Sequence, residues 1–273
     1  MICPTALTVA GSDSGGNAGI QADLRAFHIF GVHGCTVITA LTAQNPNAVS
    51  GIFPVDPAFV TAQLDAVLPV YAVAAVKTGM LFSPGIIHAA AESFRKYKPA
   101  HIVADPVMVA TSGAKLLDDE AIDVLVSDLL PQVSLITPNL PEAGVLCGHI
   151  PASSSEMVAA AEKLSVRFNT SVLIKGGHDS SDLAQDVLCT PGGVFSLSSP
   201  RIKNPVSTHG TGCSLSAALT ASLACGNPLL EAVVEAKAYV FEAIRSGVFV
   251  GEKAGVMGMP RRLPVEVVRV ERL

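Results

Sequence analysis

A short glycine-containing turn that leads directly into a helix-forming segment is the feature of this sequence best suited to chemistry. The turn is His209-Gly210-Thr211-Gly212-Cys213, and residues 214–224 after it are rich in Ala and Leu. The first N–H groups of a helix lack partners within the helix, so they attract an anion together with the helix dipole. We therefore expect Gly210, Thr211 and Gly212 to hold a transferring phosphoryl group. Cys213 would stand beside it as a base, with its thiolate favoured by the helix end. The alternative is a glycine-rich loop before a buried helix, with Cys213 as a small core residue.

Polar or glycine residues follow directly after the short apolar runs that we predict to be strands. These polar segments are residues 11–19, 42–45, 77–80, 105–108, 137–142 and 175–178. Ligands of open α/β sheets bind beyond the carboxyl ends of the strands, so the segments are expected to meet at one site. Taken singly, Asp13, Asn139 and Asp105 have an alternative role as turn or helix-capping residues. The recurrence of polar residues at strand ends is what indicates a site.

The residue types at these strand ends suit the transfer of a phosphoryl group. Asp105 and Glu142 offer hard carboxylate oxygens for Mg²⁺, directly or through water, and Lys175 offers a point charge for nucleotide phosphates. Gly11 and the glycines after it allow the backbone to approach a small substrate closely. Gln44 carries a donor and an acceptor side by side, which fits a heteroaromatic edge such as that of an aminopyrimidine. A P-loop and a Rossmann dinucleotide site are excluded, because neither G-x-x-x-x-G-K-S/T nor G-x-G-x-x-G occurs at these positions.

Strands that alternate with helices must position these residues. Strands are predicted over 7–10, 35–41, 73–76, 102–104, 134–137 and 172–174, and helices over 20–30, 59–68, 84–97, 153–168, 214–224 and 229–246. Residues 187–189 and 194–197 flank Pro191-Gly192-Gly193 and predict an antiparallel hairpin, and an irregular tail is expected after the last helix. This alternation predicts an α/β fold with a mostly parallel sheet and helices on both faces. No linker divides the chain, so we expect a single domain over residues 1–273.

Composition narrows the classes of protein that fit this sequence. Of 273 residues, 49% are hydrophobic and 15% charged, which is enough apolar material for a large core. A net charge of −5 offers no basic surface for nucleic acid. The six cysteines are scattered without a C-x-x-C pair, so free thiols in a reducing compartment are expected rather than zinc or disulfides. We find neither a signal peptide nor an apolar run of about 18 residues, and we therefore expect a cytoplasmic protein with no membrane partner.

Taken together and in order, the motifs resemble those of the hydroxymethylpyrimidine/phosphomethylpyrimidine kinases of thiamine biosynthesis, in the ribokinase-like superfamily. The matching segments are residues 10–16, 18–23, 39–45, 77–81, 105–108, 137–139, 142–143 and 209–213. The resemblance implies a three-layer αβα sandwich with a small β-hairpin. It also implies an ATP- and Mg²⁺-dependent kinase that phosphorylates 4-amino-5-hydroxymethyl-2-methylpyrimidine and then phosphorylates the resulting monophosphate to the diphosphate.

The resemblance also implies roles for individual residues. Gln44 would hold the pyrimidine, surrounded by Ala18, Asp23, Met80 and Val107. Cys213 would replace the Asp base of sugar kinases, as a base or as part of an anion hole. Asp105 and Glu142 would lie near the metal and the phosphates. The nucleotide residues would be Asn139, Lys175 and Lys237, although Lys237 has an alternative place on a solvated helix face. A homodimer is also expected.

The sequence departs from the family pattern in three places. Asn17 stands where a third glycine is usual, which predicts a reshaped substrate loop. Thr111 and Ala114, within residues 109–114, replace a Lys and an Asp, which predicts a flap that closes less firmly. The usual Gly-x-Gly-Pro-x-x-His ending is absent, and residues 255–262 and an apolar and charged tail over 265–273 stand in its place.

Two other functions fit parts of the sequence. A pyridoxal kinase of the same branch is disfavoured by Gln44, because such kinases tend to lack this glutamine. A pyrimidine-binding regulatory protein without catalysis is disfavoured by the intact turn over residues 210–213 and by the two carboxylates, Asp105 and Glu142.

Overall fold

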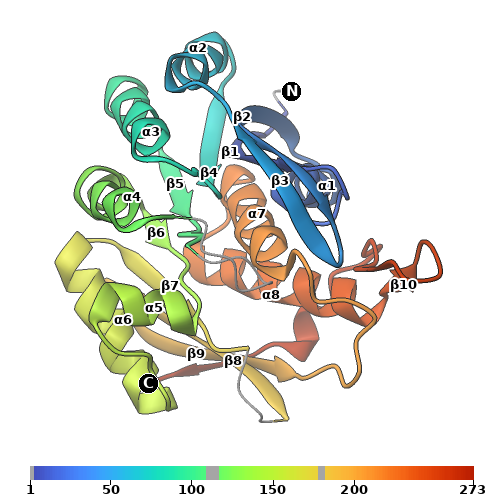
Figure 1. Ribbon diagram of the computed structural model, residues 1–273. Coiled ribbons are helices and arrows are strands. Elements are labelled where there is room, and N and C mark those ends of the chain that lie inside the picture. Colours follow the sequence, from blue (N-terminus) through green and yellow to red (C-terminus); the bar gives the residue numbers. More distant parts are fainter. Residues whose placement is uncertain (1–2, 109–116, 178–181) are drawn as a thin grey trace.

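A mixed sheet forms the centre of the computed structural model, which describes residues 3–108, 117–177 and 182–273. Its strands lie in the order β12-β9-β8-β7-β6-β5-β4-β1-β2-β3 (Figure 1). The strands are β1 Thr5–Asp13, β2 His33–Asn45, β3 Ala48–Pro54, β4 Val73–Thr78, β5 His101–Ala104, β6 Leu135–Ile136, β7 Ser171–Lys175, β8 Leu183–Thr190, β9 Gly193–Pro200 and β12 Arg269–Arg272. A separate small hairpin pairs β10 Val248–Phe249 with β11 Gly255–Val256.

The middle of the sheet is parallel and its two edges are antiparallel. Strands β7, β6, β5, β4, β1 and β2 run parallel to one another. Strand β3 closes one edge antiparallel to β2, and β8, β9 and β12 extend the other edge. The predicted parallel sheet and the β8–β9 hairpin are confirmed. The prediction of an irregular tail is wrong for its last residues, because β12 pairs along β9.

Helices cover both faces of the sheet, which gives three layers (Figure 1). They are α1 Gly19–Ile29, α2 Pro57–Val67, α3 Pro84–Tyr97, α4 Asp119–Val124, α5 Leu140–Cys147, α6 Ser154–Phe168, α7 Thr211–Ala224 and α8 Leu229–Arg245. Alternate strand residues point to opposite faces: Leu7 and Val76 pack with α2 to α6, whereas Ala6 and Ala75 pack with α1, α7 and α8. The αβα sandwich implied by the resemblance is therefore confirmed.

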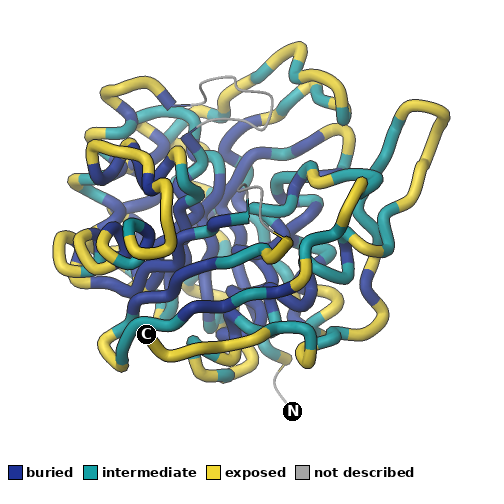
Figure 2. Tube along the Cα trace, turned by 90° about the horizontal axis from the view of Figure 1, so that it is seen from below, coloured by how far each residue is buried: buried dark blue, intermediate teal, exposed yellow. Residues whose placement is uncertain are grey.

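Helix α7 is buried on all sides between the sheet, α1 and α8, and all of its residues from Ser214 to Ala224 are buried. Its Ala and Ser residues allow this close packing. The hydroxyls of Ser216 and Thr220 donate to backbone carbonyls four residues earlier, at 3.0 and 2.7 Å, so burial leaves neither without a partner. In Figure 2 the buried residues form the interior of the molecule, and the exposed residues lie on its outside. The helix that carries the proposed anion site is thus held rigidly in the core.

Local sequence patterns predicted the longer helices close to their observed bounds and missed the short ones. Helix α3 spans the predicted range, with Ser83 accepting from the Ile86 N–H, and Ser153 caps α6 in the same way. The short helices α4 and α5 and the strand β3 were not predicted. The flap predicted over 109–114, with Thr111 and Ala114, lies outside the described residues. Within the described ranges, no helix has the combined length and apolar character needed to cross a membrane.

Candidate active site

A large cavity of about 1090 Å³ opens at the carboxyl ends of the parallel strands. The predicted residues that line it are Gly11, Ala18, Gln44, Met80, Asp105, Val107, Asn139, Glu142, Lys175, Gly210, Thr211, Gly212, Cys213 and Lys237. They come from eight separate parts of the chain, which only the fold brings together. Of the predicted site residues, Asp23 does not line the cavity.

The turn before α7 requires glycine at Gly210 for two reasons. Its φ of +86° lies in the left-handed region, and a Cβ there would collide with the backbone oxygen of Asn17. Residues 13–19 therefore pack directly against the start of α7. Asn17 itself is not among the described residues with positive φ, so its backbone does not need the glycine usual at this position.

Asp13 organises that loop. Its carboxylate accepts the backbone N–H groups of Gly15, Asn17 and Ala18 at 2.8 to 2.9 Å. Burial would raise the pKa of Asp13, but His209 and these three N–H groups outweigh it and lower the pKa below its ordinary value. Both carboxylate oxygens of Asp13 thus accept hydrogen bonds from the protein itself, which agrees with its alternative role as a turn residue.

Asp105 and Lys175 form a buried ion pair below the start of α7. Lys175 Nζ lies 2.8 Å from Asp105 Oδ1, and Ser216 Oγ of α7 lies 3.2 Å from Oδ2. Burial acts to raise the pKa of Asp105, but Lys175 and Lys77 lower it by more, so the carboxyl group is ionised. A Cβ at Gly212 would come within 3.7 Å of both Lys175 and Asp105, so the pair lies directly against the turn.

Glu142 and Asn139 form a capping box at the start of α5. Asn139 Oδ1 accepts from the Glu142 N–H at 2.9 Å, and Glu142 Oε2 accepts from the Asn139 N–H at 2.8 Å. The capping alternative for Asn139 is therefore correct, although its side chain also borders the cavity beside Lys175. Burial raises the pKa of Glu142 to about 7, with Lys175 opposing and Asp105 adding to the rise.

Cys213 lines the cavity from the first turn of α7 and is partly exposed. Burial raises the pKa of its thiol above the ordinary value, and Asp23 and Asp105 add to this rise. The expectation that the helix end favours a thiolate is therefore wrong for the free protein. The cost of removing the charge from water exceeds the attraction of the nearby Lys77.

Gln44 is held by a residue that sequence reasoning did not assign to the site, His209. Gln44 Nε2 lies 2.8 Å from His209 Nε2, and Thr42 Oγ1 lies 3.2 Å from Gln44 Oε1. The same ring nitrogen of His209 lies 3.8 Å from Asp13. These contacts orient the amide of Gln44 at the cavity wall. The only sequence signal for His209 was its place in the turn, because its partner is 165 residues away.

Lys237 is buried, so its alternative place on a solvated helix face is wrong. Its Nζ lies 2.7 Å from Asp186 Oδ2 on β8, and the other oxygen of Asp186 accepts from the Gly176 N–H at 3.0 Å. All of these residues except Gly176 border the cavity. Asp186, another residue that the sequence did not reveal, thus ties α8 to the end of β7 near Lys175.

Asp23 lies behind the cavity wall instead of in it. Its carboxylate is fully buried, accepts from Thr8 Oγ1 at 2.6 Å and lies 2.8 Å from Lys77 Nζ. Each oxygen of Asp23 thus has a partner within the protein. The implied contact between Asp23 and the substrate is not supported, because Lys77 stands between Asp23 and the cavity.

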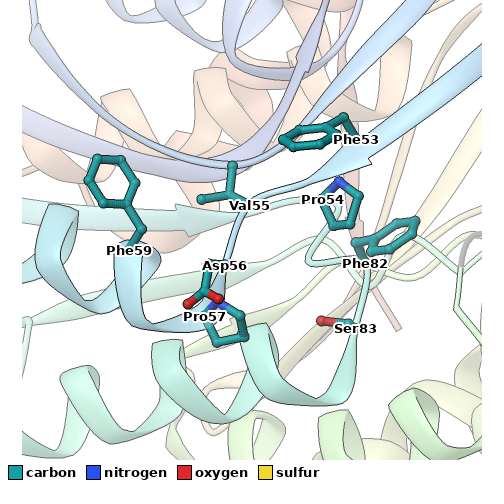
Figure 3. A pocket seen from close by; sticks show the side chains of 8 residues that line it. All are labelled: Phe53, Pro54, Val55, Asp56, Pro57, Phe59, Phe82 and Ser83. Carbon is teal, nitrogen blue, oxygen red and sulfur yellow. The ribbon is translucent and has the colours of Figure 1, made fainter.

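A second, apolar pocket lies away from this chemistry, where β3 meets the start of α2 (Figure 3). Its volume is about 630 Å³, and it is lined by Phe53, Pro54, Val55, Asp56, Pro57, Phe59, Phe82 and Ser83. Phe53 and Phe59 are 70% and 62% exposed. No lysine, histidine or cysteine lines it, and the carboxylate among its lining residues, Asp56, caps α2 by accepting from the Ala58 N–H at 2.8 Å.

Comparison with known proteins gives matches over most of the chain. The sequence pattern of the phosphomethylpyrimidine kinase family matches residues 13–258. The hydroxymethylpyrimidine/phosphomethylpyrimidine kinase of Haemophilus influenzae is 45% identical over 253 residues, which cover 91% of this chain and 94% of that protein. The thiamine biosynthesis bifunctional protein ThiED of Geobacter sulfurreducens is 48% identical over 88% of this chain. The chain spans only 49% of that longer protein.

Solved structures agree on the fold. The pyridoxal kinase of Staphylococcus aureus in complex with ADP superposes with a TM-score of 0.90 at 31% identity, over 100% of both chains. The phosphomethylpyrimidine kinase of Clostridium difficile has a TM-score of 0.78 at 38% identity, over 89% of this chain and 100% of that one. The two kinds of kinase thus share this architecture.

Proposed function

The chain belongs to the phosphomethylpyrimidine kinase family, and from this premise we propose that its substrate is 4-amino-5-hydroxymethyl-2-methylpyrimidine. ATP phosphorylates the hydroxymethyl group, and a second ATP converts the monophosphate to the diphosphate, in thiamine biosynthesis. One observation supports this above all others: Gln44, the Asp105–Lys175 pair and the turn before α7 face the same cavity. One end of the cavity thus suits an aminopyrimidine, and the other suits phosphates.

In this reaction the substrate oxygen forms a bond to the γ-phosphorus, the bond between the γ-phosphorus and the β-phosphate oxygen breaks, and ADP leaves. Backbone N–H groups of Gly210 and Gly212 stabilise the charge on the transferring group, and Thr211, whose own N–H donates to the Thr208 carbonyl at 3.3 Å, holds the turn in shape. Lys175, Lys237 and Asn139 hold the nucleotide phosphates. Cys213 as its thiolate accepts the proton of the substrate hydroxyl. Because the free thiol has a raised pKa, we expect kcat to increase with pH above neutrality.

The donor set at Asp105 and Glu142 fits Mg²⁺. Both carboxylates border the cavity and offer hard oxygen ligands. The pKa of Glu142 is raised mainly by burial, and Lys175 opposes the rise more strongly than Asp105 adds to it. Within the described ranges, no three His, Cys, Asp or Glu side chains gather into a site for a metal ion. Mg²⁺ commonly needs only one or two carboxylates when phosphates complete its shell. Bound there, it would neutralise charge on the phosphates of ATP.

Pyridoxal phosphorylation is the second candidate, because the S. aureus pyridoxal kinase shares the fold so closely. The amide of Gln44 favours the pyrimidine. It offers one acceptor and one donor in a plane, which match the amino group and ring nitrogen of an aminopyrimidine. We propose Ala18, Gly11, Met80 and Val107 as the cavity wall around that ring.

We also propose that residues 1–273 form one domain and that two copies associate. A single sheet takes strands from both ends of the chain, which supports one domain. The exposed Phe53 lies on β3, the edge strand whose outer side has no partner among the described residues, and the exposed Phe59 lies at the start of α2 after it (Figure 3). A second copy would cover this apolar edge. Light scattering of the wild type and of Phe53→Ser tests this association. A monomeric wild type contradicts the proposal.

A coupled ATP-turnover assay with Mg²⁺ tests the proposed reaction on the pyrimidine, its monophosphate and pyridoxal. Turnover of both pyrimidines supports the two-step kinase, and turnover of pyridoxal alone contradicts it. Cys213→Ala should lower kcat by about 10²-fold or more while the pyrimidine Kd changes little, because the thiol serves the transition state. Equal losses in kcat and in binding would show that Cys213 only shapes the cavity.

A further inference from the structure

An ion pair that no solvent reaches lies beneath the active-site turn. Lys77 Nζ lies 2.9 and 2.8 Å from the two carboxylate oxygens of Asp23, and both residues are 0% exposed. Thr8 Oγ1 donates to the same carboxylate at 2.6 Å. A buried ion pair contributes little to stability, because both ions lose their hydration. None of the roles described above uses this pair, so its retention in the core needs another explanation.

The position of Lys77 links the pair to the reaction. Lys77 lies two residues after Ala75 on β4, so its side chain leaves the sheet on the side of α1 and α7. Asp23 lies on α1, and α7 packs against both α1 and β4. Lys77 borders the cavity together with Cys213 and Asp105, whereas Asp23 is behind it. The cationic end of the pair therefore faces the first turn of α7.

The charges around Cys213 come from four elements. Lys77 on β4 and Lys175 on β7 are cations, and Asp23 on α1 and Asp105 after β5 are anions. Burial raises the pKa of Cys213, and Lys77 opposes this more strongly than Asp23 or Asp105 adds to it. Because Asp23 holds Lys77 from behind, the pair acts as a fixed dipole whose positive end points at the thiol. Such a preorganised charge does not need to reorient during the reaction.

We propose that Lys77 is a positioning residue for phosphoryl transfer, which stabilises the negative charge on the sulfur of Cys213, and that Asp23 and Thr8 fix Lys77 in place. Asp23 thus acts through Lys77 and not on the substrate. The inference rests on the proposed function in one respect, the role of Cys213 as the proton acceptor.

Two variants test it, Lys77→Met and the double variant Asp23→Asn/Lys77→Met. The single variant leaves a buried carboxylate without its cation and is prone to unfolding. The double variant removes both charges, so it retains a neutral and folded core. We expect the double variant to lose about tenfold or more in kcat, with the pyrimidine KM within about threefold. The pH at which iodoacetamide half-maximally alkylates Cys213, followed by peptide mass spectrometry, should rise by about one unit.

Lys96→Met is the matched control, because Lys96 pairs with Asp65 on the surface, 3.0 Å away, far from the cavity lining. It should match the wild type in both measurements. A folded double variant with wild-type kcat, or with an unchanged alkylation profile of Cys213, would overturn the proposal and leave the pair a structural role. The alkylation profile needs no substrate. If the wild type does not phosphorylate the pyrimidine, the proposed function fails, while this profile still decides the role of Lys77.

Discussion

At the residue scale, the proposed preference for an aminopyrimidine depends on how the amide of Gln44 is oriented. Gln44 is held between Thr42 and His209, so its carbonyl and amino ends have distinct neighbours. An aminopyrimidine can satisfy the remaining donor and acceptor together. An analogue without that edge leaves buried polar groups unpaired, and such a loss discriminates strongly between substrates.

Gln44→Met is expected to lower the ratio of kcat/KM for the pyrimidine to that for pyridoxal by about 10- to 100-fold. His209→Phe should change the ratio in the same direction by less, about fivefold, because the amide keeps its contact with Thr42. Gln132→Met, at a glutamine outside the cavity lining, serves as the control. An unchanged ratio in Gln44→Met would rule out the assignment of Gln44 to the pyrimidine.

The protonation of Glu142 links stability to pH. Its pKa is raised from 4.5 to about 7, so folding favours the protonated form. The stabilisation by that proton is complete below pH 4.5 and is lost as pH rises to about 7. Glu142→Gln imitates the protonated carboxyl and preserves the capping box. The variant should therefore exceed the wild type in free energy of unfolding by up to about 3 kcal/mol at pH 8, with little difference near pH 4.5.

Thermal unfolding across this pH range checks the prediction. Glu156→Gln is the control, since Glu156 accepts a backbone N–H at the start of α6 but is partly exposed. Parallel curves for wild type and Glu142→Gln would mean that folding does not raise the pKa of Glu142. A second measurement addresses the metal: the Mg²⁺ concentration for half-maximal activity should increase in Glu142→Gln, and an unaltered Mg²⁺ titration argues against a metal role.

At the scale of elements, the position of α7 relative to the loop after β1 matters most. The two meet where Gly210 approaches the Asn17 carbonyl, and Asp13 fixes the loop from the other side. The N–H groups at the start of α7 can converge on a phosphoryl group only while this contact holds. Asn17 is accommodated because only its backbone takes part in these contacts.

Gly210→Ala should therefore reduce kcat by at least about 10²-fold, since a Cβ forces the turn and the loop apart. Gly226→Ala is a matched control at the other end of the same helix. Gly226 also has a positive φ, +90°, but a Cβ there meets nothing within 4 Å. The Gly226→Ala substitution should lower the free energy of unfolding by about 1 kcal/mol and leave kcat unchanged. Similar kinetics for the two variants would show that strain, and not the contact with Asn17, sets the effect.

For the whole molecule, the sheet joins the two ends of the chain. Strand β12 covers the edge of β9 and is itself exposed, and none of its residues lines the cavity. Its contribution is thus to protect an edge that otherwise invites association with other chains.

Truncation after Pro264 should lower the free energy of unfolding by about 2 kcal/mol and increase aggregation, because β9 loses its ladder of hydrogen bonds. The kinetic constants at low protein concentration should stay within about twofold of the wild type. Val270→Thr, which preserves the pairing, is the control. A loss of kcat without a loss of stability would mean that the tail contributes to catalysis directly.

Much of the fold and most of the site were predictable from local patterns. Apolar runs and capping residues marked the long helices and the parallel strands. Since the carboxyl ends of parallel strands meet at one edge, polar residues after each run had to converge, as Gln44, Asp105 and Lys175 do. The glycine turn before a buried Ala-rich helix likewise lies at the cavity, as its residue types predicted, and its role as an anion site stays a prediction.

Only the tertiary structure decided which side chains pair. Asp23 with Lys77, Gln44 with His209 and Lys237 with Asp186 are separated by 54, 165 and 51 residues. Such pairs have no local signal, because they depend on how helices settle against the sheet. The protonation of Cys213 and Glu142 depends in turn on burial and on these neighbours. Strand β12 was not predicted for a similar reason. A short exposed strand forms because it pairs with the edge of a sheet, and its own residues carry no pattern of apolar positions.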